Sequence, residues 1–429
     1  MKKINGLRWW IISLIAVATI INYIDRTSLQ IMWPGIAKDL GFPADEVKTR
    51  LSYIITFFTI SYAIGQAVAG KFFDWVGTRI GFVVTISVWS LSCAMHGFAR
   101  NVLSFSFFRS MLGLSEAGNW PGATKSNAEW FPVNERAFAQ GIFNAGASLG
   151  AVISAPLVAF LYLLVGWQAT FIVIAGLGLI WIVPWIVLNR AEPKSHPWLS
   201  DEEKEYILTG QTKILNINSE DNRIPKWGEL LAYKESWSVI TSRFFLDSIW
   251  WLFVNWLPIY LFEKFNFNIK DIGIYGWIPY FGAALGSLAG GWTSGRFINK
   301  GWSVDKARKT SILIGAVISF PALVITAYSN QPFYAILLSA GTLFGFQFSI
   351  QSIQTLPSDF FSGKSVGSLA GMGGFAASAG VLITTLLVPV ITAGKNYLPF
   401  FYLGAAMIPL SIISIYLFAP IIQRVQVKY

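Results

Sequence analysis

The chain has 429 residues, of which 54% are hydrophobic and only 13% are charged, and its mean hydropathy is +0.54. Soluble domains carry about 25% charged residues and their cores stop growing near about 250–300 residues, so this composition excludes a soluble globular protein. The apolar surplus must face lipid. The net charge of +10 does not indicate nucleic-acid binding, because the basic residues lie between apolar runs.

Twelve apolar runs are long enough to cross a bilayer as helices, which takes about 20 residues each. They lie near residues 9–33, 50–70, 79–98, 102–124, 138–164, 167–189, 237–262, 272–297, 308–328, 332–358, 366–392 and 397–420. The first run continues into Asn22, Asp25 and Arg26 with no small-residue cleavage site, so we interpret it as a span and not as a signal peptide. The predicted fold class is an all-α polytopic membrane protein with 12 transmembrane helices.

A polar stretch divides these spans into two sets of six. We predict an N-terminal six-helix bundle over 1–190, a cytoplasmic linker over 191–236 and a C-terminal six-helix bundle over 237–429. The linker holds a short surface helix, because Ser200 is followed by Glu203 as in a capping box. Ala69-Gly70-xxx-Asp74 ends the second span and Ala289-Gly290-xxx-Ser294 ends the eighth, which suggests two related halves with a site between them.

The distribution of Lys and Arg predicts the orientation of the chain in the membrane. When both termini are placed in the cytoplasm, 22 basic residues lie in cytoplasmic segments and 7 lie outside. This bias follows the positive-inside rule. The one cysteine, Cys93, excludes a disulfide within the chain, and no His, Cys and carboxylate cluster has metal-ligand spacing, so we predict no metal site.

Charged residues inside the spans are the informative ones, since each costs at least about 2.5–3.5 kcal/mol at a helix centre. Arg109 and Glu116 are two helical turns apart on one face. They form either an anion-binding or charge-relay arginine linked to a protonatable glutamate, or a buried structural ion pair. Arg26 either grips a carboxylate with two parallel hydrogen bonds or pairs with Asp25 at a helix end.

Another charged pair and three polar stripes complete the set of candidate residues. Arg243 and Asp247, four residues apart in the seventh span, are interpreted as a structural salt bridge near the membrane surface. The stripes could offer hydroxyl and amide groups to a polyhydroxylated ligand, or could join helices. Together they suggest a polar cavity lined from both halves. The three stripes consist of Tyr62 and Gln66, of Asn144 and Ser148, and of Gln347, Gln351 and Gln354.

The loop between the second and third spans has the pattern G-xxx-D-xx-G-x-R. Its residues are Gly70, Asp74, Gly77 and Arg79. The glycines allow a tight turn and a close approach of helices. Asp74 could accept from amides at a helix N-terminus and pair with an arginine. We predict a cytoplasmic gate here, and not a substrate site.

This loop, with twelve spans and a central cytoplasmic loop, resembles the signature of the major facilitator superfamily. Further motifs over residues 1–210 resemble the anion:cation symporter family, and within it the bacterial hexuronate transporters; the second half carries only looser echoes, at Arg243-Phe244 and at Thr355-Leu356-x-Ser358-Asp359. The specific motifs are Gly6-Leu7-Arg8-Trp9, Arg109-xxx-Gly113-xx-Glu116-Ala117, Glu129-Trp130-Phe131-Pro132-xx-Glu135-Arg136, Gly141-x-Phe143-Asn144-x-Gly146 and Asp201-Glu202-Glu203.

The resemblance implies proton-coupled import of a sugar acid by alternating access. By position, it implies that Arg26 binds the substrate carboxylate, that Tyr62 and Asn144 contact hydroxyls, and that Gln347 and Gln351 line the site from the other half. It also implies that Asp25, Arg109 and Glu116 couple protonation to binding. Some hexuronate transporters lack an acid at the Asp25 position, so the proton count and the substrate stay open. Because Ser294 replaces the signature aspartate, we expect a degenerate second cytoplasmic gate.

We therefore expect a symporter in a bacterial inner membrane, acting as a monomer on a small anion and protons, with no cofactor, no metal and no nucleic acid. Aldonates, glucarate or another carboxylate are alternative substrates. An organophosphate exchanger would need paired arginines without buried acids, and Glu116 argues against it. A membrane sensor would need a larger soluble output domain than the linker and tail provide. No nucleophile and base constellation supports an enzyme.

Overall fold

The computed structural model describes residues 3–43, 45–215, 226–267, 271, 274–361, 365–392 and 396–425. Over these residues the chain is helical and has no β-strand, apart from one isolated bridge between Ile4 and Leu199. The all-α prediction is confirmed. The α-helices are α1 (Leu7–Asp39), α2 (Val47–His96), α3 (Val102–Glu116), α4 (Asn119–Trp130), α5 (Val133–Leu188), α6 (Asp201–Leu215), α7 (Trp227–Leu231), α8 (Lys234–Phe265), α10 (Ile278–Asn299), α11 (Val304–Tyr328), α12 (Pro332–Phe360), α13 (Val366–Ile391) and α14 (Leu398–Phe418), with a 3-10 turn at Pro193–Ser195.

Two of these helices each contain two predicted spans. The chain reverses direction inside α2 at Gly77 (φ 79°) and inside α5 at Gly166 (φ 75°). These left-handed angles favour glycine, because a Cβ would clash there. The fourth span is divided into α3 and α4. Eight helices of the described residues are long and apolar enough to cross a membrane, two of them folded back in this way, and the arrangement is consistent with twelve crossings.

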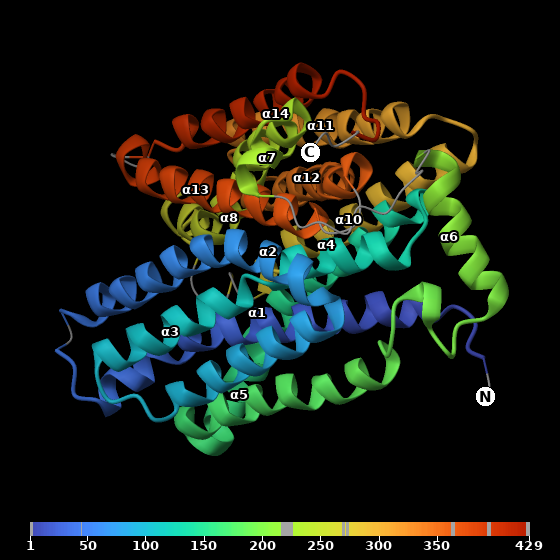
Figure 1. The fold of residues 1–429 in the computed structure, drawn as a ribbon. Helices are drawn as coiled ribbons and strands as arrows, with labels where there is room; N and C mark the ends of the chain where they lie inside the picture. The colour runs from blue at the N-terminus through green and yellow to red at the C-terminus, as the bar shows by residue number, and fades with distance from the viewer. Residues whose placement is uncertain are drawn as a thin grey trace.

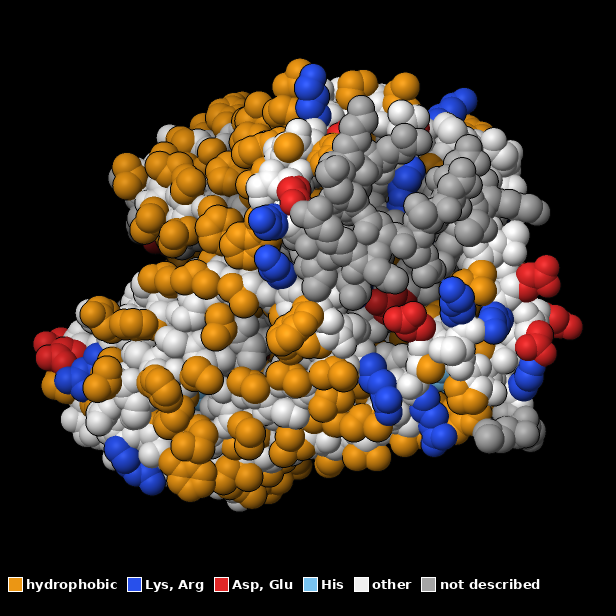
Figure 2. Space-filling view, in the orientation of Figure 1, with side chains coloured by type: hydrophobic (Ala, Val, Ile, Leu, Met, Phe, Trp, Pro, Cys, Tyr) orange, Lys and Arg blue, Asp and Glu red, His pale blue; other side chains and the backbone are white. Residues whose placement is uncertain are grey.

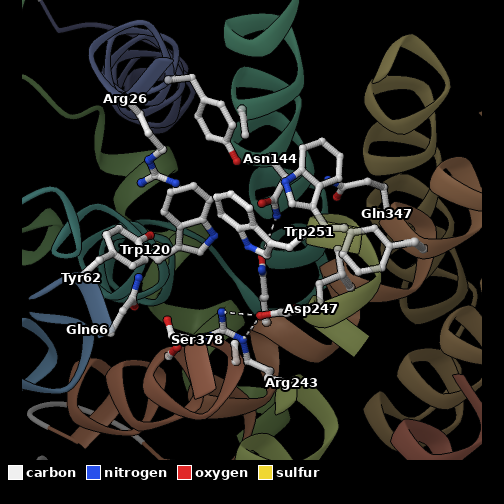
Figure 3. Close-up of a pocket in the computed structure, with 18 residues that line it drawn as sticks. Arg26, Tyr62, Gln66, Trp120, Asn144, Arg243, Asp247, Trp251, Gln347 and Ser378 are labelled. Atoms are coloured by element: carbon white, nitrogen blue, oxygen red, sulfur yellow. Dashed lines mark hydrogen bonds and ion pairs between the residues drawn. The ribbon is translucent and has the colours of Figure 1, made fainter. Parts of the chain in front are cut away.

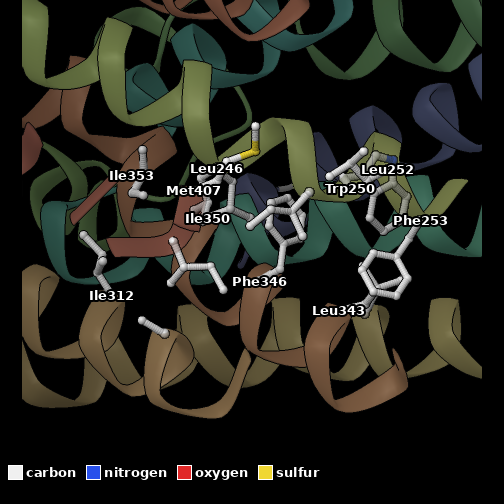
Figure 4. Packing of buried hydrophobic residues seen from close by; sticks show 14 of the residues in the cluster. Leu246, Trp250, Leu252, Phe253, Ile312, Leu343, Phe346, Ile350, Ile353 and Met407 are labelled. Atoms are coloured by element: carbon white, nitrogen blue, oxygen red, sulfur yellow. The ribbon is translucent and has the colours of Figure 1, made fainter. Parts of the chain in front are cut away.

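The buried apolar side chains form two clusters. One runs from Leu7 to Ile207 and the other consists chiefly of residues between Leu230 and Ile422. In Figure 1 the helices of the first cluster, α1 to α5, lie below those of the second, α8 to α14. Figure 4 shows part of the second cluster, where the Trp250 ring from α8 packs against that of Phe346 from α12. We call the two groups of helices the N half and the C half; the domain boundaries at 190 and 237 stay predictions.

The linker helix α6 is attached to the N half by several side chains, among them Glu203, Tyr206 and Gln211. Ser200 Oγ accepts from the Glu203 amide at 3.2 Å, which caps the helix as the sequence predicts. The Glu203 carboxylate does not complete a capping box. It accepts instead from the Gly6 amide at 2.8 Å and from Arg8 at 2.6 Å, so it caps α1 and joins the linker to the first span.

The N half and the C half touch closely at one end of the molecule. Glycines allow helix backbones to meet there: a Cβ on Gly70 would lie 2.2 Å from the Gly367 carbonyl oxygen, and one on Gly291 would lie 2.3 Å from that of Ala137. We call this the closed end; α6 lies beside it. Figure 2 shows the surface hollowed between the halves at the opposite end, which we call the open end.

Candidate functional site

A half-open cavity lies between the N half and the C half, with about 590 Å³ of unfilled space when the solvent at its mouth is included. Both halves supply its walls, and polar, charged and aromatic side chains point into it (Figure 3). The N half contributes Tyr23, Arg26, Tyr62, Gln66, Trp120 and Asn144, and the C half contributes Arg243, Asp247, Trp250, Trp251, Gln347, Gln354 and Ser378.

Arg26 supplies the cation on the N-half wall. Its Nε donates to Glu116 Oε2 at 3.2 Å and its Nη2 to Asn22 Oδ1 at 3.2 Å. The guanidinium carbon lies 4.7 Å from the Tyr62 ring centre and 5.7 Å from that of Trp251, which comes from the other half. Arg26 is therefore held by one carboxylate and by aromatic faces that stabilise a cation.

Arg109 lies behind Arg26 and outside the cavity wall. Its Nη2 donates to the Arg26 carbonyl at 2.6 Å, and its guanidinium lies 5.3 Å from the Phe58 ring centre. Arg109 and Glu116 do not form the ion pair that was one of the two interpretations from sequence, because the described ion-pair partner of Glu116 is Arg26. Two helical turns separate Arg109 and Glu116 by about 10 Å along α3, so each reaches a different turn of α1.

Asp25 is fully buried and does not line the cavity. Neither of its carboxylate oxygens has a hydrogen-bond partner among the described residues. It makes no ion pair with Arg26, although the two are neighbours in sequence, because consecutive helical side chains point in different directions. Asp25, Arg109 and Glu116 thus lie one layer behind the cavity, where Glu116 bonds to the guanidinium of Arg26 and Arg109 bonds to its backbone carbonyl.

Side-chain amides form a chain from the N half to the C half. Asn144 on α5 donates to Gln351 Oε1 at 2.8 Å and to Gln354 Oε1 at 2.7 Å, both on α12. Gln351 in turn donates to Gln347 Oε1 at 3.0 Å. Asn144 and Gln347 line the cavity as the sequence predicts, whereas Gln351 is buried behind them and holds them in place.

The loop motif lies at the closed end. Asp74 accepts from the Gly367 amide at 3.0 Å and from the Ser368 amide, at the first turn of α13, and from Lys125 Nζ at 3.0 Å. The carboxylate therefore meets a helix N-terminus of the other half. We call these residues the Asp74 cluster. Its described cation is a lysine from α4, and not an arginine of the loop.

Arg79 does not join the Asp74 cluster. Its side chain is exposed, and its described contact is made by its carbonyl, which accepts from Trp185 Nε1 at 3.1 Å. Arg79 follows Gly77, where the chain reverses, so it begins the next helix on the outer side of the turn. Its predicted place in the gate is not supported by these contacts. Gly70 and Asp74 do meet the C half, and Gly77 supplies the turn.

A second cluster of polar contacts lies at the closed end, where the sequence predicts a degenerate second gate. Arg308 donates to Asp359 Oδ2 at 2.9 Å, to Ser294 Oγ at 2.8 Å and to the Val133 carbonyl of the N half at 3.0 Å. We call this the Arg308 cluster. Ser294, which replaces the signature aspartate, accepts from Arg308, and the acid comes from Asp359 at the end of α12. The sequence pattern hid this because the acid and the loop are on different helices.

Sequence reasoning also missed several cavity residues. Trp120, Trp250, Trp251 and Ser378 were not distinguished from the many other apolar and small residues of the spans. Arg243 and Asp247 do form the predicted salt bridge, at 2.8 Å, and they also line the cavity, which the interpretation as a purely structural pair did not anticipate. Charge within a span was the signal that could have placed them there.

The sequence also resembles proteins of known function over most of its length. The hexuronate transporter of Escherichia coli K12 is 30% identical over 402 residues, which cover 94% of this chain and 91% of that protein. The galacturonate transporter of Dickeya chrysanthemi is 32% identical over 342 residues, 79% of this chain and 96% of that protein. The D-galactonate transporter of Escherichia coli O6:H1 is 26% identical over 424 residues, 97% of this chain and 97% of that protein.

Solved structures with low sequence identity share the fold. The human organic anion transporter MFSD10 superposes with a TM-score of 0.68 at 15% identity, covering 95% of this chain and 99% of that chain. The Escherichia coli fucose:proton symporter superposes with a TM-score of 0.67 at 14% identity, covering 95% and 98%. The family model described as Major Facilitator Superfamily matches residues 15–302. These matches confirm the resemblance drawn from the motifs, and the chain belongs to the Major Facilitator Superfamily of membrane transporters.

Proposed function

We propose that this protein is a proton-coupled symporter that imports a sugar acid, a hexuronate such as glucuronate or galacturonate, across a bacterial inner membrane by alternating access. The observation that carries the proposal is Arg26, a cation on the cavity wall whose described carboxylate partner, Glu116, is itself buried. The relatives named for hexuronate and galacturonate transport support the substrate class.

The cavity has the groups that a sugar acid requires. The planar guanidinium of Arg26 can bind the substrate carboxylate with two parallel hydrogen bonds. Tyr62 and Trp120 offer aromatic faces for the apolar side of a sugar ring, and Asn144 and Gln347 offer amides for its hydroxyls. Binding then draws on both halves, as alternating access around a central site demands.

Coupling follows from competition for Arg26. While Glu116 is ionised, it occupies the guanidinium that the substrate carboxylate needs. A proton on Glu116 weakens that pair and releases Arg26, so proton and anion bind together. In this scheme the proton on Glu116 frees Arg26, and not the Arg109 that the sequence linked to Glu116. Arg109 instead positions Arg26 through its carbonyl.

The energetics also fit an importer. One proton with one monoanion moves no net charge, whereas two protons carry a net +1, worth about 2.3 kcal/mol per 100 mV. Asp25 and Glu116 are two buried acids that could each carry a proton. With both termini in the cytoplasm, as the basic residues predict, the closed end is cytoplasmic and the cavity faces outward, ready for a substrate from outside.

A single transport experiment distinguishes the proposed function from other substrates and from other modes of transport. Purified protein in liposomes is supplied with labelled glucuronate, galacturonate, galactonate or glucarate, with and without an inward proton gradient. Accumulation of a hexuronate only with the gradient supports the proposal. Preferential accumulation of an aldonate or glucarate would reassign the substrate, exchange without accumulation would indicate an antiporter, and no uptake of any anion would favour a sensor.

A further inference from the structure

We infer that Asp247, held in place by Arg243, is a specificity-determining residue that binds the hydroxyl groups at the far end of the substrate and excludes a second carboxylate there. This rests on the proposed function, because it takes the first carboxylate of a sugar acid to lie at Arg26. It narrows the substrate class to sugar acids with one carboxylate.

The Arg243–Asp247 pair lies across the cavity from Arg26. Arg243 and Asp247 are on α8 of the C half, and Figure 3 shows them on the opposite side of the cavity from Arg26. Their side chains are 7% and 13% exposed. A ligand bound to Arg26 by one end therefore has its other end directed toward this pair.

The geometry of the pair leaves one oxygen unused. Arg243 donates from both Nε (3.0 Å) and Nη2 (2.8 Å) to the same Asp247 oxygen, Oδ2. A structural Arg–Asp pair commonly uses two parallel bonds to the two oxygens. Here Oδ1 of Asp247 is buried and has no hydrogen-bond partner among the described residues. A buried acceptor without a partner is unfavourable, and a ligand hydroxyl that reaches Oδ1 when the cavity closes around the substrate would satisfy it.

Arg243 is fixed and cannot turn to fill that gap. Its Nη1 donates to the Ala370 carbonyl at 3.1 Å, which ties it to α13. It also lies against Gly373, where a Cβ would be 3.1 Å from Arg243 Cδ. The arginine thus lies along the backbone of α13 and presents Asp247 to the cavity in one orientation.

The charge of the pair decides what can bind. Arg243 neutralises Asp247, so this wall adds no net charge to attract a second anion. The free oxygen of Asp247 accepts hydrogen bonds from hydroxyls and would repel a carboxylate placed at the same point. Galactarate carries a second carboxylate at C1, where galacturonate carries its hemiacetal hydroxyl, and it is an open chain whereas galacturonate is mainly a ring. The site should therefore favour galacturonate.

The experiment measures equilibrium binding of galacturonate, 2-deoxygalacturonate and galactarate to purified full-length wild type and Asp247→Asn. In the wild type, galacturonate should bind at least about tenfold more tightly than either analogue, since a hydrogen bond to a charged group contributes that much. In Asp247→Asn, galacturonate binding should weaken and both preferences should shrink. Glu263→Gln is the control, because Glu263 is on the same helix but bonds to Tyr397 away from the cavity.

Other results of this experiment would overturn either the inference or the proposed function. An equal loss for all three ligands in Asp247→Asn, or a wild-type preference for galactarate, overturns the inference while leaving sugar-acid binding intact. No binding of any of the three by the wild type overturns the proposed function. If Asp247→Asn is not monodisperse, Asp247→Glu keeps the charge but moves the acceptor; unchanged preferences in that variant also overturn the inference.

Discussion

Arg26 and Glu116, 90 residues apart in the chain, meet at 3.2 Å behind the cavity wall. This contact joins the cation that lines the cavity to an acid that does not. Because a carboxylate and a substrate anion compete for one guanidinium, the pair supplies a direct physical link between proton binding and substrate binding.

Replacing Glu116 by glutamine should abolish proton-driven accumulation but preserve exchange. The amide keeps the shape of the side chain but cannot change charge, so Arg26 stays available and no proton is required. Uptake and counterflow of the transported sugar acid in liposomes measure the two activities separately. Accumulation at the wild-type level in Glu116→Gln would contradict the coupling role, and Glu263→Gln should behave as the wild type.

Replacing Arg26 by glutamine should weaken substrate binding by at least about 30-fold, since truncating one partner of a buried hydrogen-bonded charge pair costs about 2–5 kcal/mol. Arg26→Lys should recover only part of the loss, because a lysine cannot form two parallel bonds with a carboxylate. Binding titrations of both variants measure this. Equal affinity in Arg26→Lys and wild type would show that a point charge is sufficient.

Replacing Asp74 by asparagine should loosen the closed end. The change removes the ion pair with Lys125 and weakens the contact with the first turn of α13. A single cysteine placed by Ser287→Cys in a Cys93→Ala background reports this, because Ser287 is buried where α10 meets Gly141. Maleimide labelling should rise in Asp74→Asn.

The matched control for that measurement is Arg79→Gln. The Arg79 side chain is exposed, and its described contact is made by its backbone, so labelling should stay at the wild-type rate. Similar increases in maleimide labelling in Asp74→Asn and Arg79→Gln would show that the Arg79 side chain also holds the closed end together.

Replacing Gly70 by alanine should prevent the closed end from closing. The added Cβ would lie 2.2 Å from the Gly367 carbonyl oxygen, and a backbone atom cannot yield as a flexible side chain can. Transport should fall and labelling of Ser287→Cys should rise. Gly176→Ala is the control, because nothing lies within 4 Å of its added Cβ. Normal transport by Gly70→Ala would show that the halves need not pack this closely.

The sequence by itself determined the class of molecule and the residues worth testing. Composition and twelve apolar runs required a helical membrane protein, and the rarity of charge in the spans singled out Arg26, Glu116 and Asp247. Helical spacing also identified the polar stripes that include Tyr62, Gln66, Asn144 and Gln347, each of which lines the cavity. These inferences hold because burial in lipid constrains each helix separately.

The tertiary structure decided which side chains contact one another. Spacing places two residues on one face of a helix but does not say which helix that face meets. Arg109 and Glu116 share a face and still contact different turns of α1. Lys125 from α4, and not Arg79, meets Asp74, and Asp359 at the end of α12 supplies the acid that the loop at Ser294 lacks. Such pairs depend on how helices rotate and pack against one another, which no local pattern records.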